Sequence, residues 1–175
     1  MTLEQKYQAL LHEAQQRGLA DVQGIRLCFE ILSLAAAIDR DCAALLAPHG
    51  LSEGRFVLLF LLHAAGQGGL APNQLAEQAG ISRATVTGLL DGLAREGLIE
   101  RLPDAHDRRA LRIQLTPQGQ ALAQPLLAQH SAWIASVLAP LNTRERQQLS
   151  QLLGKLAQHL PHARAHAGGV QEQAT

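Results

Sequence analysis

The sequence is poor in aromatic residues and in cysteine, and it has no excess of charge of either sign. Aromatic residues make up 3% of its 175 residues, so leucine and alanine must fill most of any core. Its two cysteines, Cys28 and Cys42, cannot form the disulfide framework of a small secreted domain. Basic and acidic residues balance at 15 each, so the net charge predicts no polyanionic partner. If the chain binds a nucleic acid, its basic residues must be concentrated locally.

Long apolar runs are also missing. The longest, residues 56–62, is far shorter than the roughly 20 residues that span a bilayer. The first 18 residues are polar and carry both signs of charge, so they lack the basic start and apolar middle of a secretory signal. These absences predict a cytoplasmic protein with no membrane partner. Apolar residues nevertheless make up 47% of the chain, which is typical of a folded globular protein.

The spacing of apolar residues predicts a mainly α-helical chain with one small β-hairpin. Steps of three and four residues indicate helices, and we expect these over residues 3–17, 22–47, 53–65, 72–79, 82–96, 117–139 and 143–160. Apolar and polar residues alternate over 98–102 and 110–115, which predicts two strands joined by a long, charged turn. Pro161 should end the last helix and leave 161–175 as a disordered tail.

The expected helix over 82–96 has two contrasting faces. Its apolar face, with Val86, Leu89, Leu90 and Leu93, must be buried. The opposite side of its N-terminal half has small or hydrogen-bonding residues, namely Ala84, Thr85, Thr87 and Gly88. Arg83 lies on the flank of this side. Such residues let a helix approach base edges and phosphates. Ser82 is placed to cap this helix.

The turn of the expected hairpin is rich in basic residues. Arginine at the tip of a narrow ribbon suits the minor groove of DNA, where negative potential is focused, and the tip contains His106, Arg108 and Arg109. Asp107 would repel phosphate, so we expect it to hold a neighbouring guanidinium through a bidentate pair. Three helices followed by such a hairpin form an arrangement that enters DNA grooves. The sequence therefore predicts a winged helix-turn-helix.

Several segments together resemble the MarR family of bacterial regulators. The resemblance covers about residues 24–160 and rests on residues 75–87 (LAEQAGISRATVT), 93–101 (LAREGLIER), 107–109 (DRR) and 115–119 (LTPQG). It implies a homodimer that binds double-stranded DNA at a near-palindromic operator, with one recognition helix in the major groove and one wing in the minor groove per subunit. It also implies groove contacts by Ser82, Arg83, Thr85 and Thr87, and a wing arginine at Arg109 with Asp107 as its buttress.

The resemblance also implies an organisation and a mode of action. We expect an N-terminal extension helix (1–21), a dimerisation helix (22–50), a winged helix-turn-helix DNA-binding lobe (51–116) and C-terminal dimerisation helices (117–160). The broad apolar stripe expected on the helix over 22–47 agrees with a role in dimerisation, because one neighbouring helix covers only part of such a stripe. The expected function is transcriptional repression, relieved by a small aromatic acid or phenol. No catalytic motif is recognisable, and we expect neither enzymatic activity nor a cofactor.

The ligand of such a regulator would sit between the dimerisation helices and the DNA-binding lobe. An arginine or histidine beside an aromatic ring suits a ring that carries a carboxylate, and the candidates are Arg26, His49, Arg55, Phe56, Phe60, His63 and Trp133. Each has an ordinary alternative. Phe56 and Phe60 are four residues apart on an apolar helix and can be simple core, His63 can be an exposed helix end, and Arg55 can pair with an acid or a phosphate.

Three other readings stay open. A redox-responsive regulator of the same fold would use Cys28 and Cys42, which lie too far apart on one expected helix to join within a subunit. A metal sensor would use His159, His162 and His166, but no cysteine lies near them and we expect no metal. A winged helix can also serve only as a protein-interaction module.

Overall fold

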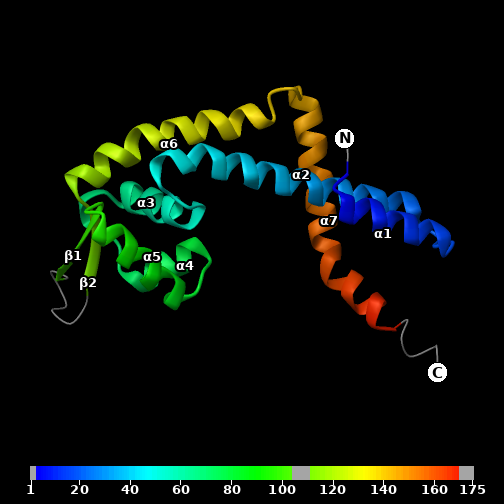
Figure 1. Ribbon diagram of the computed structural model, residues 1–175, viewed down its shortest axis with the longest axis horizontal. Coiled ribbons are helices and arrows are strands. Elements are labelled where there is room, and N and C mark those ends of the chain that lie inside the picture. The colour runs from blue at the N-terminus through cyan, green and yellow to red at the C-terminus, as the bar shows by residue number, and fades with distance from the viewer. Residues whose placement is uncertain (1–2, 104–110, 170–175) are drawn as a thin grey trace. The chain divides into compact units, whose positions relative to one another are not determined.

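The computed structural model describes residues 3–103 and 111–169 and has the expected mainly helical architecture (Figure 1). Its helices are α1 (Gln5–Gln16), α2 (Val22–Leu46), α3 (Glu53–Ala65), α4 (Pro72–Ala79), α5 (Arg83–Arg95), α6 (Pro117–Val137) and α7 (Thr143–Gly169), with short 3-10 helices η1 (Ala47–His49) and η2 (Gly66–Gly68). Strands β1 (Ile99–Pro103) and β2 (Leu111–Leu115) form the hairpin. The fold class predicted from the sequence, mainly α with a β-hairpin wing, is confirmed.

One predicted boundary is wrong. Helix α7 continues through Pro161 to Gly169, so residues 161–169 are helical rather than part of a disordered tail. Proline removes one backbone donor from a helix. Three of the six residues that follow it, 162–167 (HARAHA), are alanine, which has the highest helix propensity and favours continuation of the helix. The rest of the predicted tail, 170–175, lies outside the described residues.

The chain divides into two compact units, residues 1–130 and 131–175. In the first unit, the extension helix α1 packs along α2 (Figure 1). The rings of Tyr7 and Phe29 stack with centroids 4.8 Å apart, and Arg40 Nη1 lies 3.1 Å from Glu4 Oε1. These contacts attach α1 to the helix that follows it.

The core of the lobe lies among α3, α4, α5 and the hairpin. Its innermost side chains are mainly leucine, as the shortage of aromatic residues requires: Leu58, Leu59, Leu62, Leu75, Val86, Leu90, Leu93 and Ile113. The strands pair antiparallel from Ile99 opposite Leu115 to Pro103 opposite Leu111. Leu70, just before α4, adds a single bridge to Ile113 at the outer edge of β2. This bridge ties the start of the helix-turn-helix to the wing.

Large apolar side chains remain exposed on α2 and α7. In α2 these are Leu27, Ile31, Leu32 and Leu34, and in α7 they are Leu152, Leu153, Leu156 and Leu160. So many exposed large apolar side chains on one helix are typical of a surface that another protein chain covers. Among the described residues no single helix is long and apolar enough to cross a membrane. The segments Val22–His49 and Glu53–Gly68 meet that test only as a pair, bent by 73°.

Candidate nucleic-acid interface

The turn between α4 and α5 fixes the direction of the second helix. Gly80 adopts a left-handed conformation (φ +66°), and the N–H of Ile81 donates to the carbonyl of Ala76 at 3.1 Å. Ser82 caps α5, because its hydroxyl accepts from the N–H of Thr85 at 3.1 Å. The same hydroxyl lies 2.8 Å from Thr85 Oγ1. The tight turn and the cap predicted from the sequence are both confirmed.

Helix α5 separates its buried and exposed residues as the sequence predicts, except that Leu89, expected to be buried, is only partly buried. Val86, Leu90 and Leu93 are at most 2% exposed and pack into the lobe. All the predicted groove-contact residues of this helix and its cap are exposed, namely Ser82, Arg83, Ala84, Thr85, Thr87 and Gly88. Thr87 Oγ1 donates to the carbonyl of Arg83 at 3.0 Å, which leaves its methyl group and both hydroxyl lone pairs for a partner. The exposed face is therefore small, polar and free of acidic side chains over its first two turns.

The start of α5 borders a cleft with α4. The cleft has a volume of about 450 Å³ and is lined by Asn73, Ala76, Glu77, Ile81, Ser82 and Arg83. No ion pair to Arg83 is found within residues 3–103 and 111–169. A basic side chain beside a helix N-terminus suits an anion such as a backbone phosphate. This geometry is compatible with contact to the DNA backbone.

The base of the wing is held by two arginines that bind the protein itself. Arg101 Nη2 on β1 lies 2.5 Å from Asp91 Oδ1 on α5. Arg112 Nη1 on β2 donates to the carbonyls of Gly68 at 2.7 Å and Gly69 at 3.1 Å. These contacts connect the wing to α5 on one side and to η2 on the other.

The predicted tip of the wing, with His106, Asp107, Arg108 and Arg109, lies outside the described residues. The roles expected for Asp107, Arg108 and Arg109 remain predictions.

The junction of α5, β1 and α6 explains why threonine and glycine occupy positions 116 and 119 of the LTPQG segment. Thr116 Oγ1 donates to the carbonyl of Gly97 at 2.6 Å and accepts from the N–H of Gly119 at 3.0 Å. The N–H of Thr116 donates to the carbonyl of Leu98 at 3.1 Å. A Cβ at Gly119 would lie 1.9 Å from the Leu98 oxygen. Threonine and glycine at this spacing let α6 begin in direct contact with the start of the wing.

The candidate ligand residues occupy different environments. Arg55 is engaged within the protein: it pairs with Glu96, just after α5, and its Nη1 donates to the carbonyl of Gly50 at 2.9 Å. Arg26 Nε forms an exposed pair with Glu30 on the same helix, at 3.1 Å. His49 is exposed at the end of η1. The acid-paired reading of Arg55 is therefore the one that the structure supports.

The aromatic and histidine candidates also differ in burial and in their contacts. Phe56 is buried and packs on His130 with ring centroids 4.6 Å apart, whereas Phe60 is half exposed. His63 is partly buried and its Nδ1 has no hydrogen-bond partner among the described residues. Trp133 belongs to the second compact unit, whereas the other candidates belong to the first.

Sequence reasoning missed His130. It lies four residues after Leu126 and seven after Ala123, both buried on α6, so helical spacing places it on the same buried face. That spacing could have identified it.

The two cysteines differ in environment. Cys28 is exposed and Cys42 is buried, with its Sγ 3.8 Å from His130 Nε2. Burial raises the pKa of the Cys42 thiol, and the negative charges of Glu53, Asp39 and Asp41 raise it further. A thiol held in its protonated form is a poor nucleophile. This argues against Cys42 as the reactive group of a redox sensor.

No group of three or more His, Cys, Asp or Glu side chains suited to a metal is found among the residues that the structure describes. Of the three histidines considered in the sequence, His159 is exposed on α7. The side chains of His162 and His166 lie outside those that the structure describes.

Comparison with known proteins identifies several close likenesses. Residues 51–111 match the MarR family. The HTH-type transcriptional repressor YetL of Bacillus subtilis is 32% identical over 155 residues, which is 89% of this chain and 93% of YetL. The HTH-type transcriptional regulator PecS of Dickeya dadantii is 30% identical over 150 residues, covering 85% of this chain and 90% of PecS. A crystal structure of an S. aureus MepR–DNA complex shares the fold, with a TM-score of 0.66 and 24% identity over 75% of this chain and 96% of MepR.

Proposed function

This chain belongs to the MarR family of winged-helix transcriptional regulators, and we propose that it represses transcription. Members of this family bind DNA and are not enzymes. We propose further that the chain acts as a homodimer and that a small ligand releases it from DNA. The observation that carries the proposal is the exposed, acid-free face at the start of α5. Repression is supported by the relative YetL, a transcriptional repressor with which the chain aligns over nearly its whole length. Such a regulator acts in the cytoplasm, where its operator lies.

The dimer is supported by the exposed leucines of α2 and α7. Burial of apolar surface contributes about 25 cal/mol per Å², so leaving these two faces in water is unfavourable. A second copy that covers them would present a second α5. Two recognition helices related by a two-fold axis read two half-sites about 34 Å apart, which is why a near-palindromic operator is expected.

The ligand is proposed to be an aromatic acid or a phenol. It would bind where α3 meets the helices that flank the lobe, near Phe56 and the unpartnered Nδ1 of His63. A buried ring nitrogen with no partner is costly unless something pairs with it, and a phenol hydroxyl or a carboxylate can do so. A ligand changes DNA affinity only if it binds the DNA-free state better than the bound one.

The experiment is fluorescence anisotropy of DNA from the promoter beside the gene for this protein, measured at several salt concentrations. We expect tight, salt-dependent binding by the wild type. Arg83→Ala should weaken binding and reduce the salt slope by about one, because it removes one phosphate contact. Arg109→Ala tests the wing in the same way. Arg95→Ala is the matched control, because Arg95 is exposed at the opposite end of the same helix.

Two results would contradict the proposal. If Arg83→Ala and Arg95→Ala behave alike, the start of α5 is not the DNA-contacting surface. If a folded dimer ignores promoter DNA at low salt and genomic DNA does not compete, the winged helix serves as a protein-interaction module instead. Where the wild type does bind, aromatic acids are added to the preformed protein–DNA complex, and a fall in anisotropy identifies those that release the DNA.

A further inference from the structure

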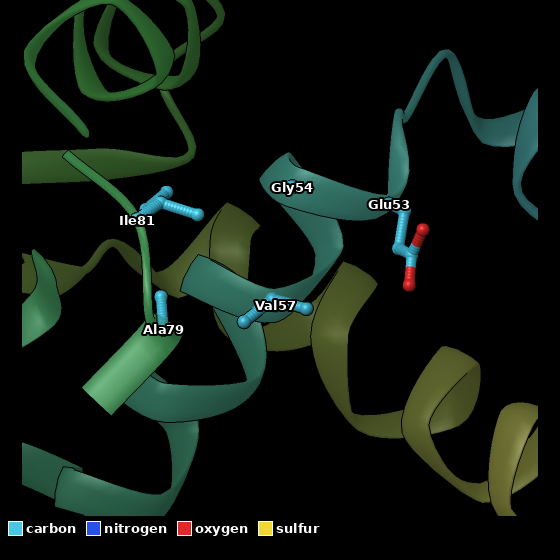
Figure 2. Close-up of a pocket in the computed structure, with 5 residues that line it drawn as sticks. All are labelled: Glu53, Gly54, Val57, Ala79 and Ile81. Carbon is cyan, nitrogen blue, oxygen red and sulfur yellow. The ribbon is translucent and has the colours of Figure 1, made fainter. Parts of the chain in front are cut away.

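A second cavity also borders the α4–α5 turn, and it shares Ile81 with the cleft at Ser82 and Arg83. It has a volume of about 340 Å³, within the range of small-molecule sites, and is lined by Glu53, Gly54, Val57, Ala79 and Ile81. Figure 2 shows Ala79 and Ile81 on one side of it, Gly54 and Val57 of α3 opposite, and the carboxylate of Glu53 at the far end. The walls are therefore apolar and the one charged group is negative.

The electrostatics of this cavity select the ligand. Glu53 lies in the first turn of α3, where a negative charge interacts favourably with the helix macrodipole. No ion pair to Glu53 is found in the described part of the chain. Its charge also reaches the interior, because it contributes to the raised pKa of Cys42 together with Asp39 and Asp41. An aromatic acid would be repelled here, whereas a cation would find an unpaired carboxylate.

We propose that this cavity, defined by Glu53, Val57, Ala79 and Ile81, binds small apolar cations, with the apolar body against the valine, alanine and isoleucine and the positive group at Glu53. An apolar body is required because every lining residue except Glu53 lacks a hydrogen-bonding side chain. A positive group is required because a bound neutral or anionic ligand would leave the carboxylate partly desolvated and unpaired. The site is distinct from the one proposed for an aromatic acid.

Occupation of the cavity acts on the recognition helix directly. Ile81 lines both this cavity and the cleft that contains Ser82 and Arg83, so it separates the ligand from the DNA-facing surface. Beside the cavity, Leu89 of α5 packs so closely on α3 that a Cβ at Gly54 would lie 3.2 Å from its Cδ1. A bound cation that displaces Ile81 therefore shifts the start of α5. This regulatory step rests on the DNA-binding function proposed above, whereas the binding site does not.

The test uses two ligands of matched shape and opposite charge, without DNA. Benzyltrimethylammonium and phenylmethanesulfonate share a benzyl group and a tetrahedral head. Each is titrated into the full-length protein while the methyl signals of Val57 and Ile81 are followed by NMR. We expect the ammonium to shift both signals and the sulfonate to shift neither. Glu53→Gln should weaken ammonium binding about fivefold or more, the value of a partly exposed ion pair. Glu100→Gln, an exposed change of equal charge on β1, should leave it unchanged.

Equal binding of both ligands, shifts confined to other methyl groups, or unchanged affinity in Glu53→Gln would each overturn the site. The regulatory step is tested separately by anisotropy with promoter DNA, where saturating ammonium should lower DNA affinity. Unchanged DNA affinity would overturn that step and leave the site standing. Failure of the ligand-free wild type to bind any DNA would instead contradict the proposed function.

Discussion

Replacement of Gly119 by alanine tests whether the contact between α6 and the wing holds the lobe together. A methyl group there would lie 1.9 Å from the carbonyl oxygen of Leu98 and 2.9 Å from its carbonyl carbon. Both are backbone atoms, so no side-chain rotation relieves the overlap. The backbone of Leu98 is itself fixed, since its N–H donates to Leu93 at 3.0 Å and its carbonyl accepts from Thr116 at 3.1 Å.

The expected loss of stability follows from these contacts. Overpacking of this kind costs about 1–3 kcal/mol, and displacing the Leu98 carbonyl from Thr116 costs about 1 kcal/mol more. The higher helix propensity of alanine returns up to about 1 kcal/mol. Gly119→Ala should therefore lower the free energy of unfolding by about 1–3 kcal/mol.

The assay is urea unfolding at a fixed protein concentration, because dimerisation makes stability depend on concentration. Gly88→Ala is the control: it places the same methyl group inside α5, where no other atom lies within 4 Å. The control should gain up to about 1 kcal/mol from helix propensity. If Gly119→Ala proves as stable as the wild type, α6 and the wing do not meet as closely as described, and the structural reason for glycine at this position fails.

Three further predictions concern the wing, Cys42 and α1. Asp91→Asn should reduce DNA affinity by about two- to fivefold in anisotropy, because Arg101 no longer ties the wing to α5; unchanged affinity would show that the pair does not position the wing. In a Cys28→Ser background, Cys42 should react with a thiol reagent only after unfolding in urea, since burial raises its pKa; stoichiometric labelling of the native protein would contradict this. Lys6 and Arg40 lower the pKa of Glu4 below its ordinary 4.5, so its contribution to α1 docking is present at neutral pH and is lost as the pH falls below about 4.5. The protection of α1 amides against hydrogen exchange should therefore fall with pH in the wild type but much less in Glu4→Gln; equal falls would exclude this role.

Local signals in the sequence predicted most of the fold. Helix ends follow from residues with one strong preference, such as Ser82 as a cap and Gly80 with a positive φ. The two faces of α5 follow from spacing alone, because a helix that buries Val86 and Leu90 must expose Thr87. The exposure of the predicted DNA-contacting face was therefore predictable, whereas contact with DNA remains a prediction.

Features that depend on tertiary contacts were not predictable in the same way. The pairing of Arg55 with Glu96 joins residues 41 positions apart, and no local pattern indicates it. The packing of Phe56 on His130 brings α3 and α6 together over a still longer separation. Helix α7 continues through Pro161 because the helix propensity of the residues beyond it outweighs the loss of one backbone hydrogen bond. A proline is a strong local stop signal, so the sequence alone predicts that the helix ends there.

The contacts of Arg55 have a consequence for how the lobe can move. Its guanidinium joins the carbonyl of Gly50, where α2 gives way to α3, to Glu96, where α5 gives way to the wing. The next two residues, Gly97 and Leu98, are bound by Thr116 at the start of α6. A displacement at the end of α2 must therefore either carry the end of α5 with it or break the Arg55 contacts. The ends of α5, the helix proposed to contact DNA, are thus held from two sides, at Glu96 through Arg55 and at Ile81 beside the proposed cation cavity.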